Sequence, residues 1–471
     1  MSAARGTVGE TAPRLFGTDG IRGVVGSLYV PSFLADIGAA YATWLGPPGT
    51  VLLARDFRTS SPGMAQILGG TMQMLGFDVV VLGPMPTPCL QFNVREGGAR
   101  GGLMVTASHN PPEFNGIKFC GPNGLEIPPE AERKIEEIVH HREFLHPTWE
   151  RAGTIREDPG AIPRYLSSIR ANLDGELIAR RRPHVVLDPG NGTSAVTSPL
   201  LLRQLGCRLT TLNSNPDGTF PGRPSEPTEQ NLTDLRRVVP LIGAALGVAH
   251  DGDSDRITFI DEKGGFISGD IMLGLFARYM LEKHPGGTVV TSITSSTLVR
   301  DVVEKAGGKF VATRSGSLPV AVGVEEHNAV FGGEENGHCY WPKHQNAPDG
   351  PMASGVMLEL LAASGRPLSE LVAEMPAYRL LKRNVPVGPE QLKSTLEHVR
   401  KSLGGEADRI ETIDGVKAYY PDGWVLVRPS GTEPLFRVFA ESRTAEGVQR
   451  LSDRGVAVVL EFTGRGPGKA S

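Results

Sequence analysis

Short hydrophobic runs alternate with segments of helical periodicity along the first three quarters of the chain. In the first of these units, apolar runs at residues 51–54 and 77–82 flank an amphipathic segment at residues 64–75. Short runs that are apolar throughout are typical of strands buried on both faces, and the segment between them is long enough to cross over as a helix. The pattern therefore predicts an α/β layer.

The same order recurs twice further along the chain. The second unit has predicted strands at residues 185–188 and 208–212, with a helix at residues 199–205 between them. The third unit alternates predicted helices with predicted strands, in the order 271–281, 288–293, 297–305 and 309–313. No short sequence repeat links the units, so the pattern predicts three α/β domains in tandem and not a solenoid.

The pattern changes after Pro386. Helices are predicted at residues 391–403 and 444–460, and strands at residues 418–427 and 435–441. The connections between these strands indicate antiparallel pairing, and hence an α+β unit. The expected domains cover residues 14–147, 158–261, 264–375 and 383–464.

Length, charge and hydrophobic content narrow the class of protein. The chain has 471 residues, 39% of them hydrophobic, and its 48 basic and 52 acidic residues give a net charge of −4. A chain without excess positive charge has no field to hold a polyanion, so nucleic acid is not an expected partner. The longest apolar stretch, residues 238–249, is far shorter than the about 20 residues of a membrane span, which predicts a cytoplasmic protein that binds no membrane. The four cysteines form no C-x-x-C pair, which predicts reduced, mostly buried thiols without a catalytic role.

A predicted strand that ends at Val105 leads into T-A-S-H-N-P-P, residues 106–112. Two prolines stop the strand and hold the following loop rigid, which presents Ser108. A serine in this position can act as a nucleophile or carry a phosphoryl group, with His109 as its hydrogen-bond partner. The alternative is an ordinary turn in which serine and asparagine satisfy the backbone.

Three carboxylates occupy alternate positions in D-G-D-S-D-R, residues 251–256, between two apolar runs. Asp251, Asp253 and Asp255 on one loop converge on a hard divalent cation, and Mg²⁺ is favoured where a phosphate oxygen completes the ligand set. An EF-hand is disfavoured because Arg256 stands where that loop needs glycine. A solvated acidic turn, and a phosphatase with Asp251 or Asp253 as nucleophile, remain open.

Three further loops combine polar side chains with glycine. In R-P-S-G-T-E-P, residues 428–434, a guanidinium, two hydroxyls and the amides around the glycine form a cradle for a phosphate dianion, to which Arg437 adds charge. In G-G-E-E-N-G-H, residues 332–338, glutamate and asparagine suit adjacent hydroxyls of a sugar. F-G-T-D-G-I-R-G, residues 16–23, is either a further anion loop or an entry turn, with Arg22 as the residue to test. Each of the three is also compatible with an ordinary turn.

Together and in this order, the five motifs closely resemble the α-D-phosphohexomutase superfamily, which comprises phosphoglucomutases, phosphomannomutases and phosphoglucosamine mutases. The resemblance extends from Phe16 to Arg437. It implies an enzyme, an isomerase that moves a phosphoryl group within a sugar phosphate. It also implies a fold of three α/β domains and a C-terminal α+β domain of the TATA-binding-protein-like type around a central cleft. The division into four domains agrees with that fold.

The resemblance implies a role for each matching residue. Ser108 would be the phosphoserine that donates and reclaims the phosphoryl group, and one of its oxygens would complete a Mg²⁺ site. The other metal ligands would be Asp251, Asp253 and Asp255. The groups that assist the transfer would be His109, Lys118 as general acid/base, Arg22 and Arg256. The residues that bind the sugar and its second phosphate would be Glu334, Asn336, His338, Arg428, Ser430, Gly431, Thr432 and Arg437.

The resemblance also implies a hexose 1,6-bisphosphate intermediate, in a monomer or homodimer that acts on small sugar phosphates. The substrate stays open between glucose or mannose phosphates and, as the alternative, glucosamine phosphate. Two departures from the family pattern bear on that choice: Asn336 stands where bacterial members commonly have serine, and residues 313–317 match the usual Val-Gly-Asp stretch only loosely. Two functions of other classes remain, a non-catalytic sugar-phosphate-binding protein and a hydrolase with an aspartate nucleophile.

Overall fold

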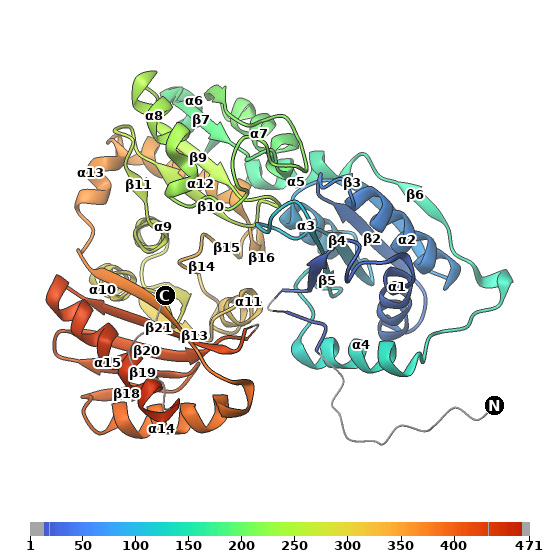
Figure 1. Ribbon diagram of the computed structural model, residues 1–471. Coiled ribbons are helices and arrows are strands. Elements are labelled where there is room, and N and C mark those ends of the chain that lie inside the picture. Colours follow the sequence, from blue (N-terminus) through green and yellow to red (C-terminus); the bar gives the residue numbers. More distant parts are fainter. Residues whose placement is uncertain (1–13, 18, 432, 464–471) are drawn as a thin grey trace.

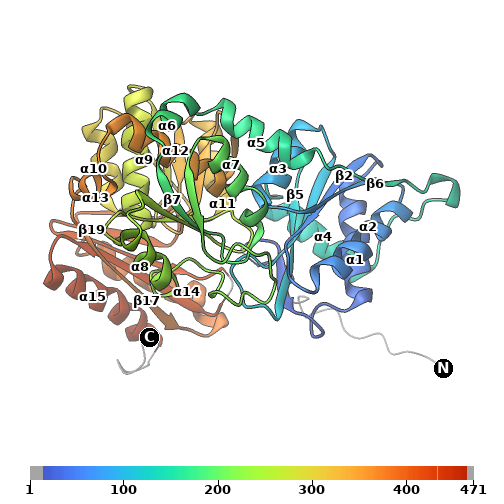
Figure 2. The same ribbon diagram turned by 90° about the horizontal axis from the view of Figure 1, so that it is seen from above.

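The computed structural model describes residues 14–17, 19–431 and 433–463, which form four units in chain order (Figures 1 and 2). The first three units are mixed sheets with helices packed against them, and the sheet of the fourth is antiparallel throughout. The predicted fold class is therefore confirmed. Within the described residues, no helix is long and apolar enough to cross a membrane.

The first unit, in blue and cyan in Figure 1, contains a six-stranded sheet. Its elements are β1 (Ile21–Val24), α1 (Pro31–Leu45), β2 (Thr50–Arg55), α2 (Ser61–Met74), β3 (Asp78–Pro84), α3 (Thr87–Glu96), β4 (Gly101–Val105), β5 (Phe114–Cys120), α4 (Pro129–His141) and β6 (Ile155–Glu157). The strand order is β1-β5-β4-β2-β3-β6, and β5 runs antiparallel to both of its neighbours. The last three residues of the motif at residues 16–23 thus lie in the edge strand β1, which places Arg22 on a strand and not in a loop.

The second unit has a five-stranded sheet in the order β11-β10-β9-β7-β8. Its elements are α5 (Ala161–Ala171), α6 (Gly175–Arg181), β7 (His184–Asp188), α7 (Ser198–Gln204), β8 (Arg208–Thr211), α8 (Thr233–Leu241), β9 (Leu246–His250), β10 (Ile257–Ile260) and β11 (Phe266–Ile267). Strands β8, β7 and β9 are parallel, whereas β10 returns antiparallel to β9. The acidic motif is the connection between β9 and β10.

The third unit has a five-stranded sheet in the order β13-β12-β14-β15-β16. Its elements are α9 (Gly269–Lys283), β12 (Thr288–Ser292), α10 (Thr297–Lys305), β13 (Lys309–Thr313), α11 (Ser317–Glu326), β14 (Phe331–Gly333), β15 (Cys339–Trp341), β16 (Gln345–Pro348), α12 (Gly350–Ser364) and α13 (Leu368–Ala373). Strands β13, β12 and β14 are parallel, and β15 is antiparallel to β14. The predicted sugar loop connects β14 to β15.

The fourth unit is an antiparallel sheet in the order β17-β21-β20-β19-β18. Its elements are β17 (Arg379–Pro386), α14 (Leu392–Gly404), β18 (Arg409–Glu411), β19 (Val416–Tyr420), β20 (Gly423–Pro429), β21 (Leu435–Ser442) and α15 (Ala445–Thr463). The single strand expected at residues 418–427 is wrong, because the chain reverses at Pro421 and Asp422 into the hairpin β19–β20. Proline has no N–H for a ladder, and a side chain at Gly423 would collide with the carbonyl oxygen of Glu441 on β21.

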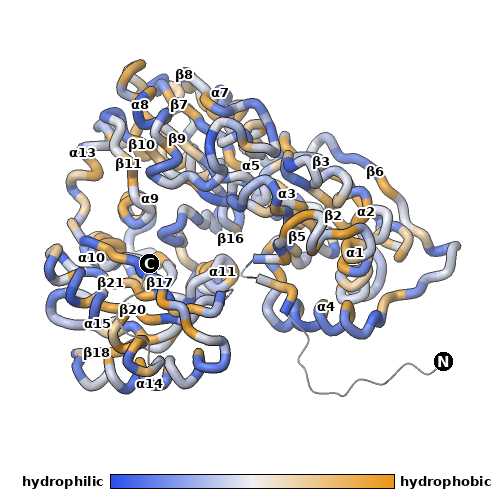
Figure 3. The backbone as a smooth tube through the Cα atoms, in the orientation of Figure 1, coloured by the Kyte–Doolittle hydropathy of each residue, from blue (hydrophilic) through white to orange (hydrophobic). Residues whose placement is uncertain are grey.

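Clusters of buried hydrophobic side chains join the units, and Figure 3 shows where hydrophobic residues lie along the backbone. One cluster runs from the α3 side of the first sheet through the second and third units, and it includes Met85, Tyr165 and Phe276. The fourth unit has a core of its own. A small cluster joins it to the third unit, consisting of Ile293, Trp424, Leu426 and Phe439. One cluster thus spans the first three units beside separate clusters such as that of the first unit, and the fourth unit is attached to the third through a smaller apolar contact.

All four cysteines are buried free thiols, as the sequence predicts. They are Cys89, Cys120, Cys207 and Cys339. Burial raises the pKa of Cys207 to about 12, and burial raises the thiol pKa of the other three as well. Thiols that stay protonated are poor nucleophiles, in agreement with a packing role.

Candidate active site

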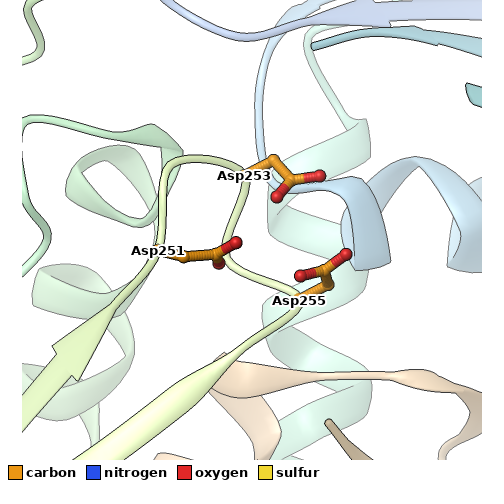
Figure 4. Close-up of side chains that lie close together, drawn as sticks. All are labelled: Asp251, Asp253 and Asp255. Atoms are coloured by element: carbon orange, nitrogen blue, oxygen red, sulfur yellow. The ribbon is translucent and has the colours of Figure 1, made fainter. Parts of the chain in front are cut away.

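The acidic loop at residues 251–256 brings three carboxylates together. Ser254 has a positive φ of 66°, and the turn lets Asp251, Asp253 and Asp255 face a common space (Figure 4). Each of the three offers a ligand oxygen within 4.8 Å of the others, and all three side chains are buried. Burial and repulsion by the other two carboxylates raise the pKa of Asp251 well above its usual range. A cluster of this kind is costly unless cations neutralise it.

The hydrogen bonds of the three carboxylates show which oxygens a metal ion could use. Asp251 Oδ1 accepts from the backbone N–H groups of Ser254 (2.9 Å) and Arg256 (3.2 Å). In the part of the chain that is described, Asp253 Oδ1 and Asp255 Oδ1 are buried and accept no hydrogen bond. Hard carboxylate oxygens without another partner are the ligands that Mg²⁺ or Ca²⁺ takes, and no soft ligand is among them. The donor set therefore fits a hard divalent cation.

Ser108 reaches this cluster from the first unit. It lies in the loop after β4 with a φ of 48°, in the left-handed region that non-glycine residues seldom adopt. Its Oγ donates a hydrogen bond of 2.7 Å to Asp251 Oδ2, and Oγ lies 3.1 Å from His109 Nδ1. The side chain is buried, so water has little access to the hydroxyl. The structure thus brings the predicted phosphoryl carrier into direct contact with a predicted metal ligand.

Arg58, which sequence reasoning missed, holds the Ser108 loop in shape. This residue is 0% exposed, and its Nε–H pairs with the buried carboxylate of Asp56 at 3.1 Å. The terminal nitrogens of the guanidinium donate to four backbone carbonyl oxygens, those of Ser108, Asn110, Pro111 and Phe114. Because a buried guanidinium needs several acceptors, this arrangement fixes the loop from beneath.

Lys118 on β5 is buried among three carboxylates. Its Nζ lies 2.7 Å from Asp19, 2.9 Å from Asp253 and 2.7 Å from Asp255. Burial by itself would lower the pKa of Lys118, but these three carboxylates raise it well above its usual range. The ammonium ion therefore stays charged and offsets part of the negative charge of the acidic loop.

His109 contacts Ser108, and two arginines, Arg22 and Arg256, lie close enough to affect the charge of His109. Arg22 pairs with Asp19 at 2.8 Å and donates to Asn110 Oδ1 at 3.1 Å. Arg256 Nε is buried and has no hydrogen-bond partner among the described residues. Burial, followed by the charges of the two arginines, lowers the pKa of His109 to about 2, so its imidazole is neutral. Positive charge beside Ser108 is what a transferring phosphoryl group requires.

The predicted sugar loop lies beside the acidic cluster. Glu334 Oε2 lies 3.0 Å from His338 Nδ1, and Glu334 Oε1 accepts the N–H of Gly316 at 2.9 Å. His338 Nε2 lies 3.5 Å from Asp255 Oδ1, and although burial opposes it, Asp255 and Glu334 raise the pKa of His338 to about 10. Asn336 is exposed, and its side chain accepts the N–H of His338 in the turn. Glu334 and His338 are thus fixed near the cluster, whereas Asn336 shapes the turn.

Arg428 of the predicted phosphate loop is held by a carboxylate that the sequence reasoning missed. Its Nε lies 2.9 Å from Asp414 Oδ2, and the same oxygen accepts the N–H of Ser315 in the third unit at 3.2 Å. Arg437, on β21, lies 3.5 Å from Glu433 in the turn before that strand. Asp414 therefore connects the guanidinium to the loop before α11, across the boundary between the third and fourth units.

The turn that follows Arg428 contains the other predicted phosphate-binding residues. Ser430 is buried, whereas Gly431 is exposed and faces open space, since a Cβ there would meet no atom. Thr432, also predicted to bind phosphate, lies outside the described residues.

Comparison with known proteins identifies the family. All four domains of phosphoglucomutase/phosphomannomutase match: the three alpha/beta/alpha domains over residues 13–146, 163–265 and 268–378, and the C-terminal domain over residues 381–457. A phosphoglucomutase/phosphomannomutase from Thermococcus kodakarensis is 39% identical over 95% of this chain and 99% of its own length. A protein named as a probable phosphoglucosamine mutase from Methanopyrus kandleri is 40% identical over 95% of this chain and 98% of its own.

The chain belongs to the phosphoglucomutase/phosphomannomutase family. The crystal structure of a family protein from Burkholderia thailandensis superposes with a TM-score of 0.85 at 26% identity, and the match covers 97% of this chain and 98% of that one. Members of this family are phosphomutases, which are isomerases. The resemblance inferred from the five motifs is therefore confirmed, and so is the expected class of enzyme.

The residues of the phosphomutase site that sequence reasoning missed share one property. Asp19, Arg58, Thr87 and Asp414 each contact a predicted site residue that belongs to a different strand or loop. Asp19 lies within the motif at residues 16–23, so its carboxylate could have been singled out there. For the other three, the sequence contains no signal beyond a polar side chain next to the end of a strand.

Proposed function

We propose that this chain is a Mg²⁺-dependent phosphohexomutase that interconverts the 1-phosphate and 6-phosphate of glucose or mannose. The reaction proceeds through phosphorylated Ser108 and a hexose 1,6-bisphosphate. The observation that carries the proposal is the 2.7 Å hydrogen bond from Ser108 Oγ to Asp251 Oδ2, inside a buried cluster in which Asp253 Oδ1 and Asp255 Oδ1 accept no hydrogen bond from the described residues. Ser108 is thus beside both the expected metal and the cationic side chains.

The bonds and protons of the phosphoryl transfer balance within the site. The P–O bond at Ser108 Oγ breaks as a free hydroxyl of the hexose monophosphate forms a new P–O bond, and a hexose 1,6-bisphosphate results. The charged Lys118 would donate a proton to Ser108 Oγ as the P–O bond breaks and take up the proton that the sugar hydroxyl loses, so that Lys118 is charged again at the end of the step. The reverse step at the other phosphate then restores phosphoserine. A divalent cation bound by the three aspartates would neutralise charge on the transferring group.

The chain's own residues divide the remaining tasks. Arg22 and Arg256 lie beside Ser108 and offset charge on the equatorial oxygens of the phosphoryl group. Glu334 and His338 face hydroxyls of the sugar, and Arg428, which has two terminal nitrogens beyond the one held by Asp414, binds the phosphate that does not react. Burial of Ser108 excludes water, so phosphoryl transfer to the sugar is favoured over hydrolysis.

A second candidate substrate, glucosamine phosphate, is favoured by one observation. Burial and the nearby charge of Asp19 raise the pKa of Glu126 to about 8. Glu126 accepts a hydrogen bond from Ser317 at 2.6 Å, where the first and third units meet. An ammonium group on a sugar beside Glu126 would stabilise the charged form of this carboxyl, whereas a hydroxyl would not.

The test is conversion of glucose, mannose and glucosamine 1-phosphates, followed by phosphorus NMR, with wild-type protein and Ser108→Ala. We expect the wild type to form 6-phosphates, and Ser108→Ala to lose conversion while it still binds the sugar phosphate. Ser369→Ala, on the distant helix α13, is the matched control and should keep full activity. Full conversion by Ser108→Ala would refute the proposal, and steady release of inorganic phosphate without isomer formation would indicate a hydrolase.

A further inference from the structure

Thr87, at the first position of α3, contacts the acidic loop of a different unit. Its Oγ1 donates a hydrogen bond of 2.6 Å to Asp253 Oδ2, and its backbone N–H donates a bond of 2.9 Å to the carbonyl oxygen of Asp253. Thr87 is 2% exposed and Asp253 is 0% exposed. The same aspartate is thus held at its side chain and its backbone by one residue of the first unit.

The contact leaves the other oxygen of Asp253 available. Oδ2 accepts from Thr87 Oγ1 and lies 2.9 Å from Lys118 Nζ, whereas Oδ1 is buried and accepts no hydrogen bond among the described residues. A hydrogen bond to one oxygen fixes the rotation of the carboxylate and so directs the other oxygen.

We propose that Thr87 is a positioning residue that orients Asp253 for the divalent cation and makes cation binding depend on contact between the first and second units. The proposal deepens the proposed function and rests on it for the role of the cation. Thr87 is not a catalytic residue, because it acts through Asp253. Its hydroxyl, and not its packing, carries the effect.

A neighbouring contact shows how the start of α3 is itself held. Gln345 of the third unit donates from Nε2 to the carbonyl oxygen of Pro88 at 3.1 Å, and to Asp349 Oδ2 at 2.6 Å. The hydroxyl of Thr87 is therefore placed by a residue of the third unit as well as by its own helix. Loss of the Gln345 contact would loosen the helix start without removing the bond to Asp253.

The experiment measures Mg²⁺ and Mn²⁺ affinity of the full-length, dephosphorylated protein by calorimetry, without sugar. Thr87→Val keeps the shape and removes the hydroxyl, and Thr87→Ser keeps the hydroxyl. Loss of a residue that orients a metal ligand typically weakens affinity by about 10–100-fold, so we expect Thr87→Val to raise Kd at least about tenfold and Thr87→Ser to stay near wild type. Activity of Thr87→Val should need more Mg²⁺ but recover its kcat at saturation.

Two results would overturn the proposal. The first is a Kd of Thr87→Val equal to that of the wild type. The second is a Gln345→Met variant that loses as much metal affinity as Thr87→Val. The packing of the units against one another, and not the hydroxyl of Thr87, would then explain the loss of affinity. The binding assay contains no sugar, so a shift in Kd stands even if Ser108→Ala shows that the proposed mutase reaction is wrong.

Discussion

Arg58 offers a test of how the Ser108 loop is held. Its guanidinium pairs with Asp56 and donates to four backbone carbonyls of the loop, at 2.6–3.0 Å. Hydrogen bonds from a charged donor contribute ~1.5–3 kcal/mol each, but bonds that share one side chain are not additive. Removal of one partner from a buried ion pair costs about 3–5 kcal/mol, because the other charge is left unpaired. We take that range as the expected destabilisation of the first unit by Arg58→Met.

The assay is thermal unfolding followed by calorimetry, together with turnover. For a domain of this size, 1 kcal/mol corresponds to roughly 2–4 °C in Tm. Arg58→Met should therefore lower the Tm at which the first unit unfolds by roughly 6–20 °C. Asp56→Asn combined with Arg58→Met should recover part of that loss, because no buried charge is then unpaired. Arg58→Lys, which keeps the charge with fewer donors, should fall between. A shift below about 2 °C with wild-type turnover in Arg58→Met would refute the reasoning.

Three further predictions concern groups around the site. Asp414→Asn should raise KM for the hexose phosphate about tenfold with little change in kcat, because Arg428 loses the charge that orients it; an unchanged KM would contradict this. Burial lowers the pKa of Lys417 to about 7, whereas an unfolded lysine holds its proton up to about pH 10, so the contribution of Lys417 to stability should rise with pH between these values. The raised pKa of His338, about 10, acts in the opposite direction over the same range. The test is therefore the Tm of the wild type minus the Tm of Lys417→Met, which should increase from pH 7 to 10; a constant difference would contradict this. Removal of divalent metal by a chelator should abolish turnover but lower Tm by less than about 3 °C, because Lys118 already neutralises part of the acidic cluster; global unfolding on chelation would contradict this.

The hydrophobic pattern predicts the buried strands well, and the reason is physical. Strands such as β2 and β9 contain runs of four residues without a polar side chain because helices or other units cover both faces of the sheet, and such runs are a clear signal. The edge strand β1 has a mixed sequence, since only its first residue is buried, and the pattern contained no sign of it. The hairpin at Pro421 was missed because apolar residues continue on both sides of a two-residue turn.

The candidate site likewise has one part that the sequence predicts and another that depends on long-range packing. Asp251, Asp253 and Asp255 are close in the sequence, and their spacing alone predicts the cluster that the structure contains. Ser108 was predicted from its own motif, but its contact with Asp251 depends on the packing of the first unit against the second. The role of Arg58 likewise arises only from long-range contacts. A single sequence without aligned relatives carries no information about such pairs.

The most direct test of the account follows a labelled phosphoryl group from Ser108. The protein is loaded with radiolabelled phosphate from hexose 1,6-bisphosphate, its labelled residue is identified by mass spectrometry, and unlabelled hexose phosphate is added for a single turnover. The account predicts acid-stable label on Ser108 that passes to the sugar at the rate of turnover, and no label on Ser108→Ala. Label on Asp251 or Asp253, or direct release of label as inorganic phosphate at the turnover rate, would contradict it.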